Sequence, residues 1–440
     1  MRAVFRTTLL IAGLSHFVTA QAQSLTPAEV NNLGASAYSA GDIAQAERHL
    51  LAALASEQLH PDPLTRAAIC FNLAAVNRSR ARYAQAEALY REALQLREAA
   101  LGPDHASLAG PRRGLALCLL ARGKAREAEQ LARLAASMPN SAYNAAAALN
   151  DLANILTAAS AFVEAEEPAL KARRILENAS ATNTVAYAEV LTTLSVIFRN
   201  REQFTLSQSV SAQAASLLEH LLGPAHPSTA AAWNNLAQAL AVAGKPQEAQ
   251  PLLERAVATW EHAYGPDHPD VASGIANLAG VYQSLKRYKD AERLFTRALR
   301  IDEKYFGPDS PKIALDLNNL ASLAVSRHRD RDAAPLFGRA LAINQSAFGP
   351  EHLDTGIIAG NLAFVYYKQK RYSEAEPLFE RAARIRERSF GPEDAQLARL
   401  LDGYARVLRL NRNFSDAARV EVRATGIRVR NALHAGNQDL

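Results

Sequence analysis

The 440-residue sequence contains few residues of several kinds on which other protein classes depend. It has 21 glycines and 19 prolines, and aromatic side chains make up 7% of the chain, whereas alanine is very common. This balance excludes collagen-like and disordered chains and favours helices that pack closely through small side chains. The chain is too long for one compact core, so several domains or an elongated array are expected.

Long apolar runs are also missing. The stretch TTLLIAGLSHFVTA near the N-terminus is shorter than the ~20 residues that a membrane-spanning helix needs. Arg2 and Arg6 precede it, and Ala20–Ala22 supplies the small residues of a cleavage site. The pattern predicts a signal peptide over residues 1–22, with a buried first helix as the alternative. We therefore expect an exported protein, periplasmic or secreted, with no membrane span.

The first folded helix is predicted to begin directly after this segment. Thr26 can cap it, Pro27 fits its first position, and Glu29 can complete a capping box.

Neither sign of charge dominates the chain. Lysine and arginine number 49 against 44 acidic residues, and the formal net charge of +5 falls to +3 if Arg2 and Arg6 are removed. No concentrated basic stripe of the kind that binds nucleic acid is present, so we expect no nucleic-acid partner.

A sequence pattern repeats along the chain. After Leu278, small residues follow at offsets of 1, 13 and 20, and aromatic residues at offsets of 4 and 17. The pattern recurs every 42 residues in the second half, and at spacings of 40, 42 and 37 near the start. The ten anchor residues are Leu33, Leu73, Leu115, Leu152, Leu194, Leu236, Leu278, Leu320, Leu362 and Tyr404.

Each repeat predicts two antiparallel helices. Apolar residues fall at helical spacing before the segment SLKRY and again after it. One such pair cannot bury its apolar faces alone, so neighbouring pairs must stack. The segment YGPDHP separates the repeats, because Gly265 can adopt a left-handed conformation, Pro266 cannot continue a helix, and Asp267 or His268 can cap the next one.

The repeat resembles the tetratricopeptide family, and its 42-residue length resembles the type found in kinesin light chains. The resemblance implies an all-α, right-handed superhelical solenoid of about ten helix-turn-helix units. It covers degenerate units over residues 23–222 and regular units over 223–430, followed by a polar tail over 431–440. The departures at Ser195, Ser207 and Ser211 suggest a looser or bent region near residues 139–222.

We find no catalytic motif, and we expect neither an enzyme nor a cofactor. The histidines in the loops between repeats lie on successive units, too far apart to share a metal ion with ligand bonds of ~2 Å. Cys70 and Cys118 lie at different heights on neighbouring helices, a separation of ~9 Å along the axis, so we expect two free thiols.

The remaining candidate site is a binding groove. In the family that the chain resembles, the residue before each anchor lines the concave face, where asparagine can bind a peptide backbone. Alternatively, these asparagines bond neighbouring units to each other. Further groove positions vary between units and become aromatic and basic towards the C-terminus. The predicted groove residues are Asn235, Asn277, Asn319, Asn361, Gln238, Gln283, Phe364, Tyr367, Lys368, Arg406 and Arg409.

The expected function is a protein–protein interaction scaffold that binds a peptide or a partner helix in this groove. The alternative is a self-associating structural spacer of the cell envelope without a peptide ligand.

Overall fold

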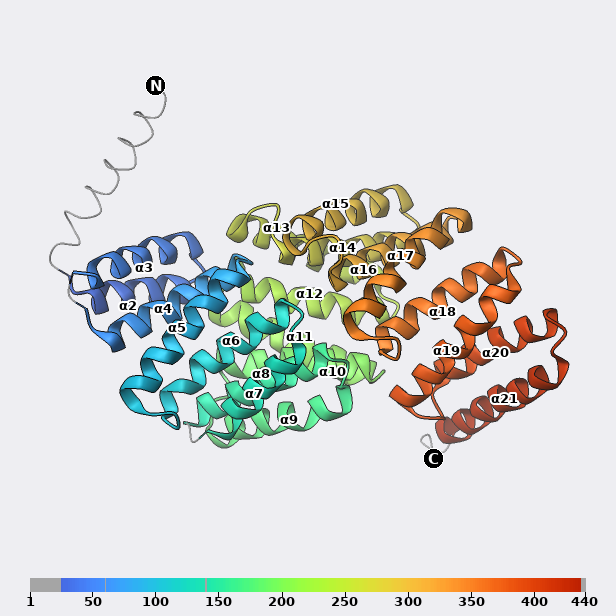
Figure 1. Cartoon of the computed structure of the whole chain (residues 1–440), viewed down its shortest axis with the longest axis horizontal. Helices are drawn as coiled ribbons and strands as arrows, with labels where there is room; N and C mark the ends of the chain where they lie inside the picture. Colours follow the sequence, from blue (N-terminus) through green and yellow to red (C-terminus); the bar gives the residue numbers. More distant parts are fainter. Residues whose placement is uncertain (1–24, 60, 139–140, 437–440) are drawn as a thin grey trace, which may run out of the picture. The chain divides into compact units, whose positions relative to one another are not determined.

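The computed structural model describes residues 25–59, 61–138 and 141–436 (Figure 1). The predicted signal peptide, residues 1–22, lies outside this part of the chain. The described residues form 20 α-helices and no strand. Consecutive helices form ten antiparallel pairs, and each of the ten predicted anchors lies in the first helix of its pair.

The ten pairs have the following bounds. They are α2 (Pro27–Ser39) with α3 (Ile43–Glu57), α4 (Pro63–Ser79) with α5 (Tyr83–Leu101), α6 (Ala109–Ala121) with α7 (Ala125–Ser137), α8 (Ala142–Ala158) with α9 (Phe162–Asn178), α10 (Val185–Asn200) with α11 (Phe204–Leu222), α12 (Pro227–Val242) with α13 (Pro246–Tyr264), α14 (Pro269–Ser284) with α15 (Tyr288–Phe306), α16 (Pro311–Ser326) with α17 (Asp330–Phe348), α18 (Leu353–Lys368) with α19 (Tyr372–Phe390), and α20 (Ala395–Leu410) with α21 (Phe414–Gly436). The last helix continues beyond residue 430, where the sequence suggested a tail.

Capping residues act as the sequence predicts. Thr26 and Glu29 form the capping box of α2, with Pro27 in its first turn. His268 and His352 cap α14 and α18 by accepting a backbone N–H at Nδ1.

The glycines that end the second helices differ in one detail from the prediction. Gly307 has φ +79° and ψ 164°, and Gly391 has φ +87° and ψ 172°. These values lie in a region that only glycine enters readily, not in the left-handed helical region expected for a helix end. The extended ψ angle turns the chain away from the helix axis and towards the next pair.

The small residues of the repeat form the seam of each pair. Ala279, Ala291 and Ala298 are fully buried, and Phe295 is nearly so. Because alanine side chains are short, the two helices can approach closely there, while the aromatic side chain fills the space towards the next pair.

The chain divides into two compact units. The N-terminal unit holds the described residues up to Ala239 and Ala258–Pro266, and the C-terminal unit holds Leu240–Val257 and the described residues from Asp267 onward. The looseness expected near residues 139–222 is not observed in the part of this stretch that the structure describes. One continuous core runs from Ala74 to Ala214, and the Ser207 hydroxyl donates to the Ser195 carbonyl at 2.8 Å, so the serines that replace apolar residues are satisfied.

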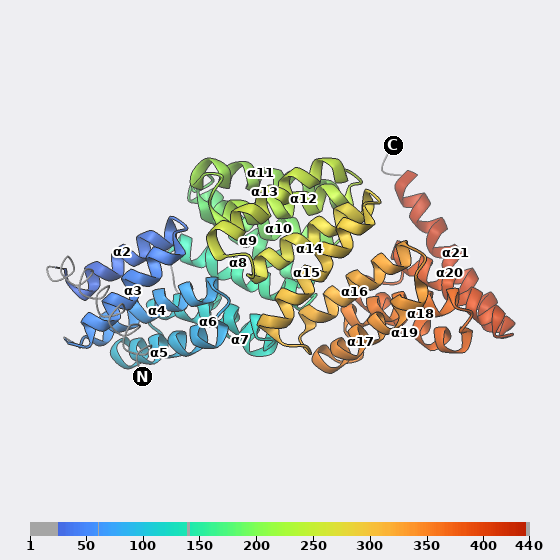
Figure 2. The same ribbon diagram turned by 90° about the horizontal axis from the view of Figure 1, so that it is seen from above.

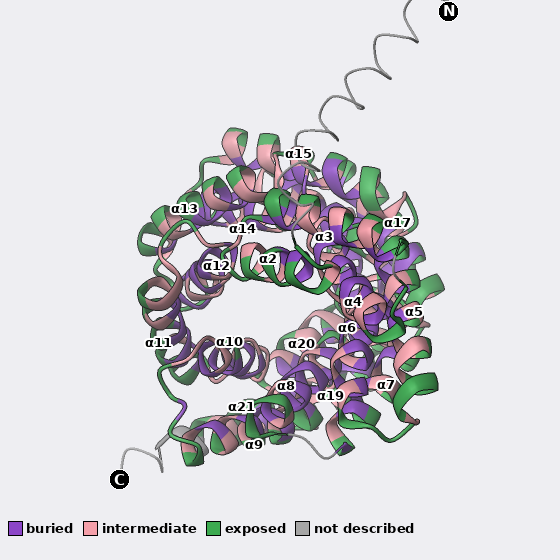
Figure 3. Cartoon of the chain, turned by 90° about the vertical axis from the view of Figure 1, so that its left-hand side faces the viewer, coloured by how far each residue is buried: buried purple, intermediate pink, exposed green. Residues whose placement is uncertain are grey.

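First helices of successive pairs contact each other within each unit. In the N-terminal unit, α2, α4, α6, α8 and α10 lie in sequence, and in the C-terminal unit α14, α16, α18 and α20 do so (Figure 2). Seen along the chain's long axis, α5, α7, α9 and α11 lie outside the first helices of the N-terminal unit (Figure 3). The first helices therefore form the inner face of this unit.

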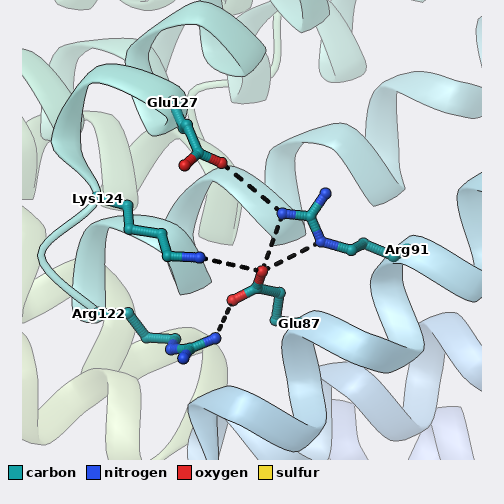
Figure 4. A network of polar contacts seen from close by, with 5 residues as sticks. All are labelled: Glu87, Arg91, Arg122, Lys124 and Glu127. Atoms are coloured by element: carbon teal, nitrogen blue, oxygen red, sulfur yellow. Dashed lines mark hydrogen bonds and ion pairs between the residues drawn. The ribbon is translucent and has the colours of Figure 1, made fainter.

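Successive pairs are joined by a recurring ionic contact that we call the inter-pair clamp. A glutamate in a second helix binds a cation in the turn of the next pair, as Glu87 of α5 binds Arg122 and Lys124 (Figure 4). Equivalent contacts join Glu47 to Arg82, Glu166 to Arg201 and Glu292 to Arg327.

Candidate binding surfaces

The row of asparagines on the first helices bonds neighbouring pairs in two places. Asn361 Nδ2 donates to Asn318 Oδ1 of the preceding pair at 2.9 Å, and Asn72 donates to Asn31 at the same distance. In these places the alternative interpretation is observed, namely that the asparagine ties one unit to the next. Asn277 and Asn319 are half-buried on the equivalent face of α14 and α16.

Three other predicted groove residues are bonded to their own array. Gln283 donates to the Ser326 hydroxyl at 2.8 Å, Lys368 pairs with Asp330 at 2.7 Å, and Arg409 pairs with Glu421 at 2.5 Å. Their polar groups are therefore occupied, and they contribute little free hydrogen-bonding capacity to a ligand. Gln238 is half-buried on α12.

A groove of about 480 Å³ lies between α18, α19 and α20 in the C-terminal unit. It brings together three predicted residues, Asn361, Phe364 and Arg406. Tyr367 lies next to it, with its ring 6.4 Å from that of Phe364. The sequence prediction missed Ile357, Arg399 and Leu400, which also line the groove.

Three glycines shape this groove. A methyl group at Gly403 would lie 2.8 Å from Phe379 Cε1, and one at Gly356 would lie 2.8 Å from Ile385 Cγ2. A methyl group at Gly360 would lie 3.2 Å from Leu400. The missing side chains let α18 and α20 sit directly on α19, which leaves a hollow along their inner faces.

The groove combines apolar surface with unpaired positive charge. Ile357 and Phe364 are 44% and 48% exposed. Arg386 pairs with Asp394, and Asp402 pairs with Arg428. Arg399 and Arg406 are exposed, and neither pairs with an acidic group among the described residues. The groove therefore suits a segment that carries an apolar side chain beside a carboxylate.

A second cavity, of about 590 Å³, lies inside the N-terminal unit and was not predicted from the sequence. Inner helices from six successive pairs line it, and Asn235 is the one predicted groove residue among them. One sequence signal marks its lining, because Arg78, Arg113, Asp151 and Glu189 place charge on helix faces that are otherwise apolar or small, but this signal does not show that these faces meet in one cavity.

The described parts of the chain hold no group of three or more histidine, cysteine, aspartate or glutamate residues placed to bind a metal ion. Cys70 and Cys118 are buried free thiols, as predicted. Burial raises the pKa of Cys70 to about 12 and that of Cys118 to about 11, so both stay protonated and unreactive at neutral pH.

These features define an α-solenoid of stacked helix pairs with hollows on its inner face. The chain belongs to the tetratricopeptide repeat family, whose model matches residues 64–141, 186–261, 228–304, 272–346, 331–381 and 354–428, most of the chain. The family prediction is therefore confirmed.

Several solved structures are similar to this chain. BtubC (BKLC) from P. vanneervenii is 22% identical, with 53% of this chain and 92% of that chain covered and a TM-score of 0.44. A protein described as a kinesin light chain with nearly identical TPR-like repeats, from Podosopora anserina, is 23% identical over 47% and 98% of the chains, with a TM-score of 0.38. A Rap protein complexed with Competence and Sporulation Factor is 16% identical over 83% and 98%, with a TM-score of 0.59. No curated protein matches the chain.

Within the described ranges, every helix is too short or too polar to cross a bilayer.

Proposed function

We propose that this protein is an exported interaction scaffold that binds an extended peptide segment along its inner helix face. The observation that carries the proposal is the groove between α18 and α20, where the predicted residues Phe364 and Arg406 meet with Ile357 and Arg399. Exposed aromatic and arginine side chains beside a hollow are the residue types that dominate binding energy at protein interfaces.

The chemistry of the groove specifies the segment. Two guanidinium groups favour one or more carboxylates, and the apolar surface of Ile357 and Phe364 favours an aliphatic or aromatic side chain nearby. The proposed ligand is therefore an acidic, hydrophobic stretch of a protein partner. The Rap protein that shares the fold is itself described in complex with Competence and Sporulation Factor, which is consistent with a ligand-binding role for such an array.

The test is a selection of displayed random peptides on the purified protein, followed by calorimetric measurement of Kd for the enriched peptides. We expect enrichment of sequences that combine acidic and hydrophobic residues. The variants Phe364→Ala and Arg406→Ala should each weaken binding at least tenfold, which corresponds to about 1.4 kcal/mol. Val422→Ala, at a residue on α21 that is 74% exposed, is the matched control and should bind like the unaltered protein.

Two outcomes would overturn the proposal. In one, no peptide is enriched, and sedimentation shows concentration-dependent oligomers, as expected of a self-associating spacer. In the other, enriched peptides bind both groove variants as tightly as the unaltered protein while thermal unfolding is unchanged.

Export is part of the proposal and is supported by the sequence of residues 2–22 alone. Sequencing the N-terminus of the protein from its native host tests it. A mature chain that begins at Gln23 is expected, and a chain that retains residues 1–22 in the cytoplasm would contradict it.

A further inference from the structure

The cavity of the N-terminal unit is open to solvent on one side and is surrounded by one turn of stacked helix pairs. Its lining comes mostly from α2, α4, α6, α8, α10 and α12, with Tyr90 of α5 and Leu218 of α11 added. The first and sixth pairs meet across it, since a methyl group at Gly41 would lie 3.0 Å from His226 and 3.1 Å from Pro227. A volume of about 590 Å³ is in the range of small-molecule binding sites, ~300–1,000 Å³.

Positive charge in this cavity is only partly neutralised. Arg113 Nε pairs with Asp151 Oδ2 at 2.6 Å. Arg78 lies beside the Tyr38 and Tyr90 side chains, and its Nε atom is buried without a hydrogen-bond partner. A buried guanidinium N–H that lacks an acceptor costs free energy, so the site favours a ligand that brings one.

Negative charge in the cavity is also unpaired. The Glu189 side chain reaches solvent inside the cavity and makes no hydrogen bond or ion pair with any described residue. The surrounding protein, together with the neighbouring Asp151, raises the pKa of this carboxyl. A cation placed beside Glu189 would offset both the burial of its carboxylate and the repulsion from Asp151.

Neutral groups complete the lining. The Asn150 Oδ1 atom is buried without a partner, and Asn235 adds a second amide. Phe71, Leu117 and Val196 supply apolar surface. Amides and apolar side chains that share a cavity with two opposite charges match a short chain of peptide units that carries a charge at each end.

We propose that this cavity binds a small zwitterion, an amino acid or a short peptide, with its carboxylate at Arg78 and its protonated amine at Glu189. Polyanions such as nucleotides are disfavoured, because Asp151 and Glu189 would repel them. The site is separate from the groove between α18 and α20, and the proposal does not depend on that groove.

The experiment measures binding of the tripeptide Ala-Leu-Ala by titration calorimetry. Forms with an acetylated amine, an amidated carboxylate or both ends blocked serve as matched ligands, and ATP serves as the polyanion. The unaltered protein is expected to bind the free tripeptide at least tenfold more tightly than any blocked form, and to bind ATP no better than the doubly blocked tripeptide.

The variant Glu189→Gln keeps the shape of the side chain and removes its charge. It should weaken binding of the free tripeptide at least tenfold and leave binding of the acetylated form unchanged. Arg78→Gln should weaken binding of the free tripeptide at least tenfold and leave binding of the amidated form unchanged. This comparison requires that the circular dichroism and melting temperature of the variant match those of the unaltered protein. Phe364→Ala in the other unit should have no effect.

The proposal is overturned if the tripeptide does not bind at millimolar concentration, or if the doubly blocked form binds equally well. It is also overturned if Glu189→Gln does not distinguish the free tripeptide from the acetylated one. Failure of the groove variants in peptide selection would leave these results unaffected, so the two proposals fail separately.

Discussion

Single residues hold the turns of this array in conformations that favour glycine. Within every pair, one residue of the turn has a positive φ angle, and only three of these ten residues are glycines. They are Gly41, Ala81, Gly123, Ser160, Glu202, Gly244, Lys286, His328, Lys370 and Arg412. Five glycines between pairs combine a positive φ angle with an extended ψ angle, which only glycine adopts readily: Gly102, Gly223, Gly307, Gly349 and Gly391.

Replacing one of these separator glycines should destabilise the protein even though space is available. No atom lies within 4 Å of a methyl group built at Gly307, so the cost of Gly307→Ala comes from the backbone alone, about 1–3 kcal/mol. Gly338→Ala, inside α17 with equally open space, should instead stabilise by about 0.5–1 kcal/mol. Urea denaturation measures both. Equal effects of the two changes would contradict the assignment of strain to Gly307.

A buried pair of aspartates makes the stability of the folded protein depend on pH. Asp302 of α15 and Asp316 of α16 are both buried, and burial together with their mutual repulsion raises the pKa of Asp316 well above its ordinary value. The folded state therefore binds more protons than the unfolded state between the ordinary and the raised pKa, and stability falls as pH rises through this window.

Asp316→Asn should remove this penalty. At pH 8 the variant is expected to be more stable than the unaltered protein by roughly 2 kcal/mol, and at pH 4 the difference should vanish. Chemical denaturation at the two pH values measures it, with the exposed Asp309→Asn in the preceding loop as the control that changes little. If Asp316→Asn changed stability equally at both pH values, the ionisation of the buried Asp316 beside Asp302 would not be the cause.

At the scale of helices, the inter-pair clamp joins several of the pairs to the pair that follows. Glu87 is 7% exposed. Burial alone would raise the pKa of Glu87, but hydrogen bonds from Arg91 and Arg122 lower it below its ordinary value. The clamp is therefore ionised at neutral pH, and its contribution is lost only as pH falls below the ordinary range of glutamate.

Removing the charge of the clamp should loosen the stacking of neighbouring pairs. Glu87→Gln is expected to destabilise the protein by about 2 kcal/mol, because Arg122 and Lys124 lose their ionic partner. Glu129 occupies the same repeat position in the next pair but binds only Arg133 of its own helix on the surface. Glu129→Gln should therefore cost less than about 0.5 kcal/mol. Thermal unfolding that ranks the two variants equally would contradict the clamp.

The sequence predicted the helices better than the surfaces they form. Pairs, caps and buried alanines follow from local spacing, since a residue such as Ala279 depends mainly on its own hairpin. The groove could not be derived in full, because its hollow depends on Gly403 meeting Phe379 of another pair. Arg409 looked available in the sequence, but Glu421 of the last helix neutralises it, and only the three-dimensional arrangement shows that pairing.

At the scale of the whole molecule, the N-terminal unit closes on itself. Its cavity collects residues as distant in sequence as Ala35 and Asn235, a juxtaposition that depends on small rotations between six successive pairs. No pattern in the sequence records those rotations, which explains why this cavity was missed. The same closure makes the unit sensitive to changes where its first and sixth pairs meet.

Acid should open this closure at His226. Burial lowers the pKa of His226, and its Nδ1 atom accepts the Ser228 N–H as a neutral ring. Because the folded pKa is depressed, the contribution of His226 to stability is present at neutral pH and is lost as pH falls below the ordinary histidine value of 6.5. The protection of the α2 and α12 amides against hydrogen exchange, corrected for intrinsic rates, should therefore be lower at pH 5.5 than at pH 7.5. Unchanged protection relative to α16 would contradict this prediction.

We propose that a peptide segment lies against the inner face formed by α18 and α20. The most direct measurement places a photo-crosslinking residue, p-benzoyl-phenylalanine, at position 364 or at position 422 and irradiates each protein with a selected acidic, hydrophobic peptide. We expect the peptide to become covalently joined at position 364 and not at position 422. Crosslinking at 422 with none at 364 would show that the ligand binds elsewhere.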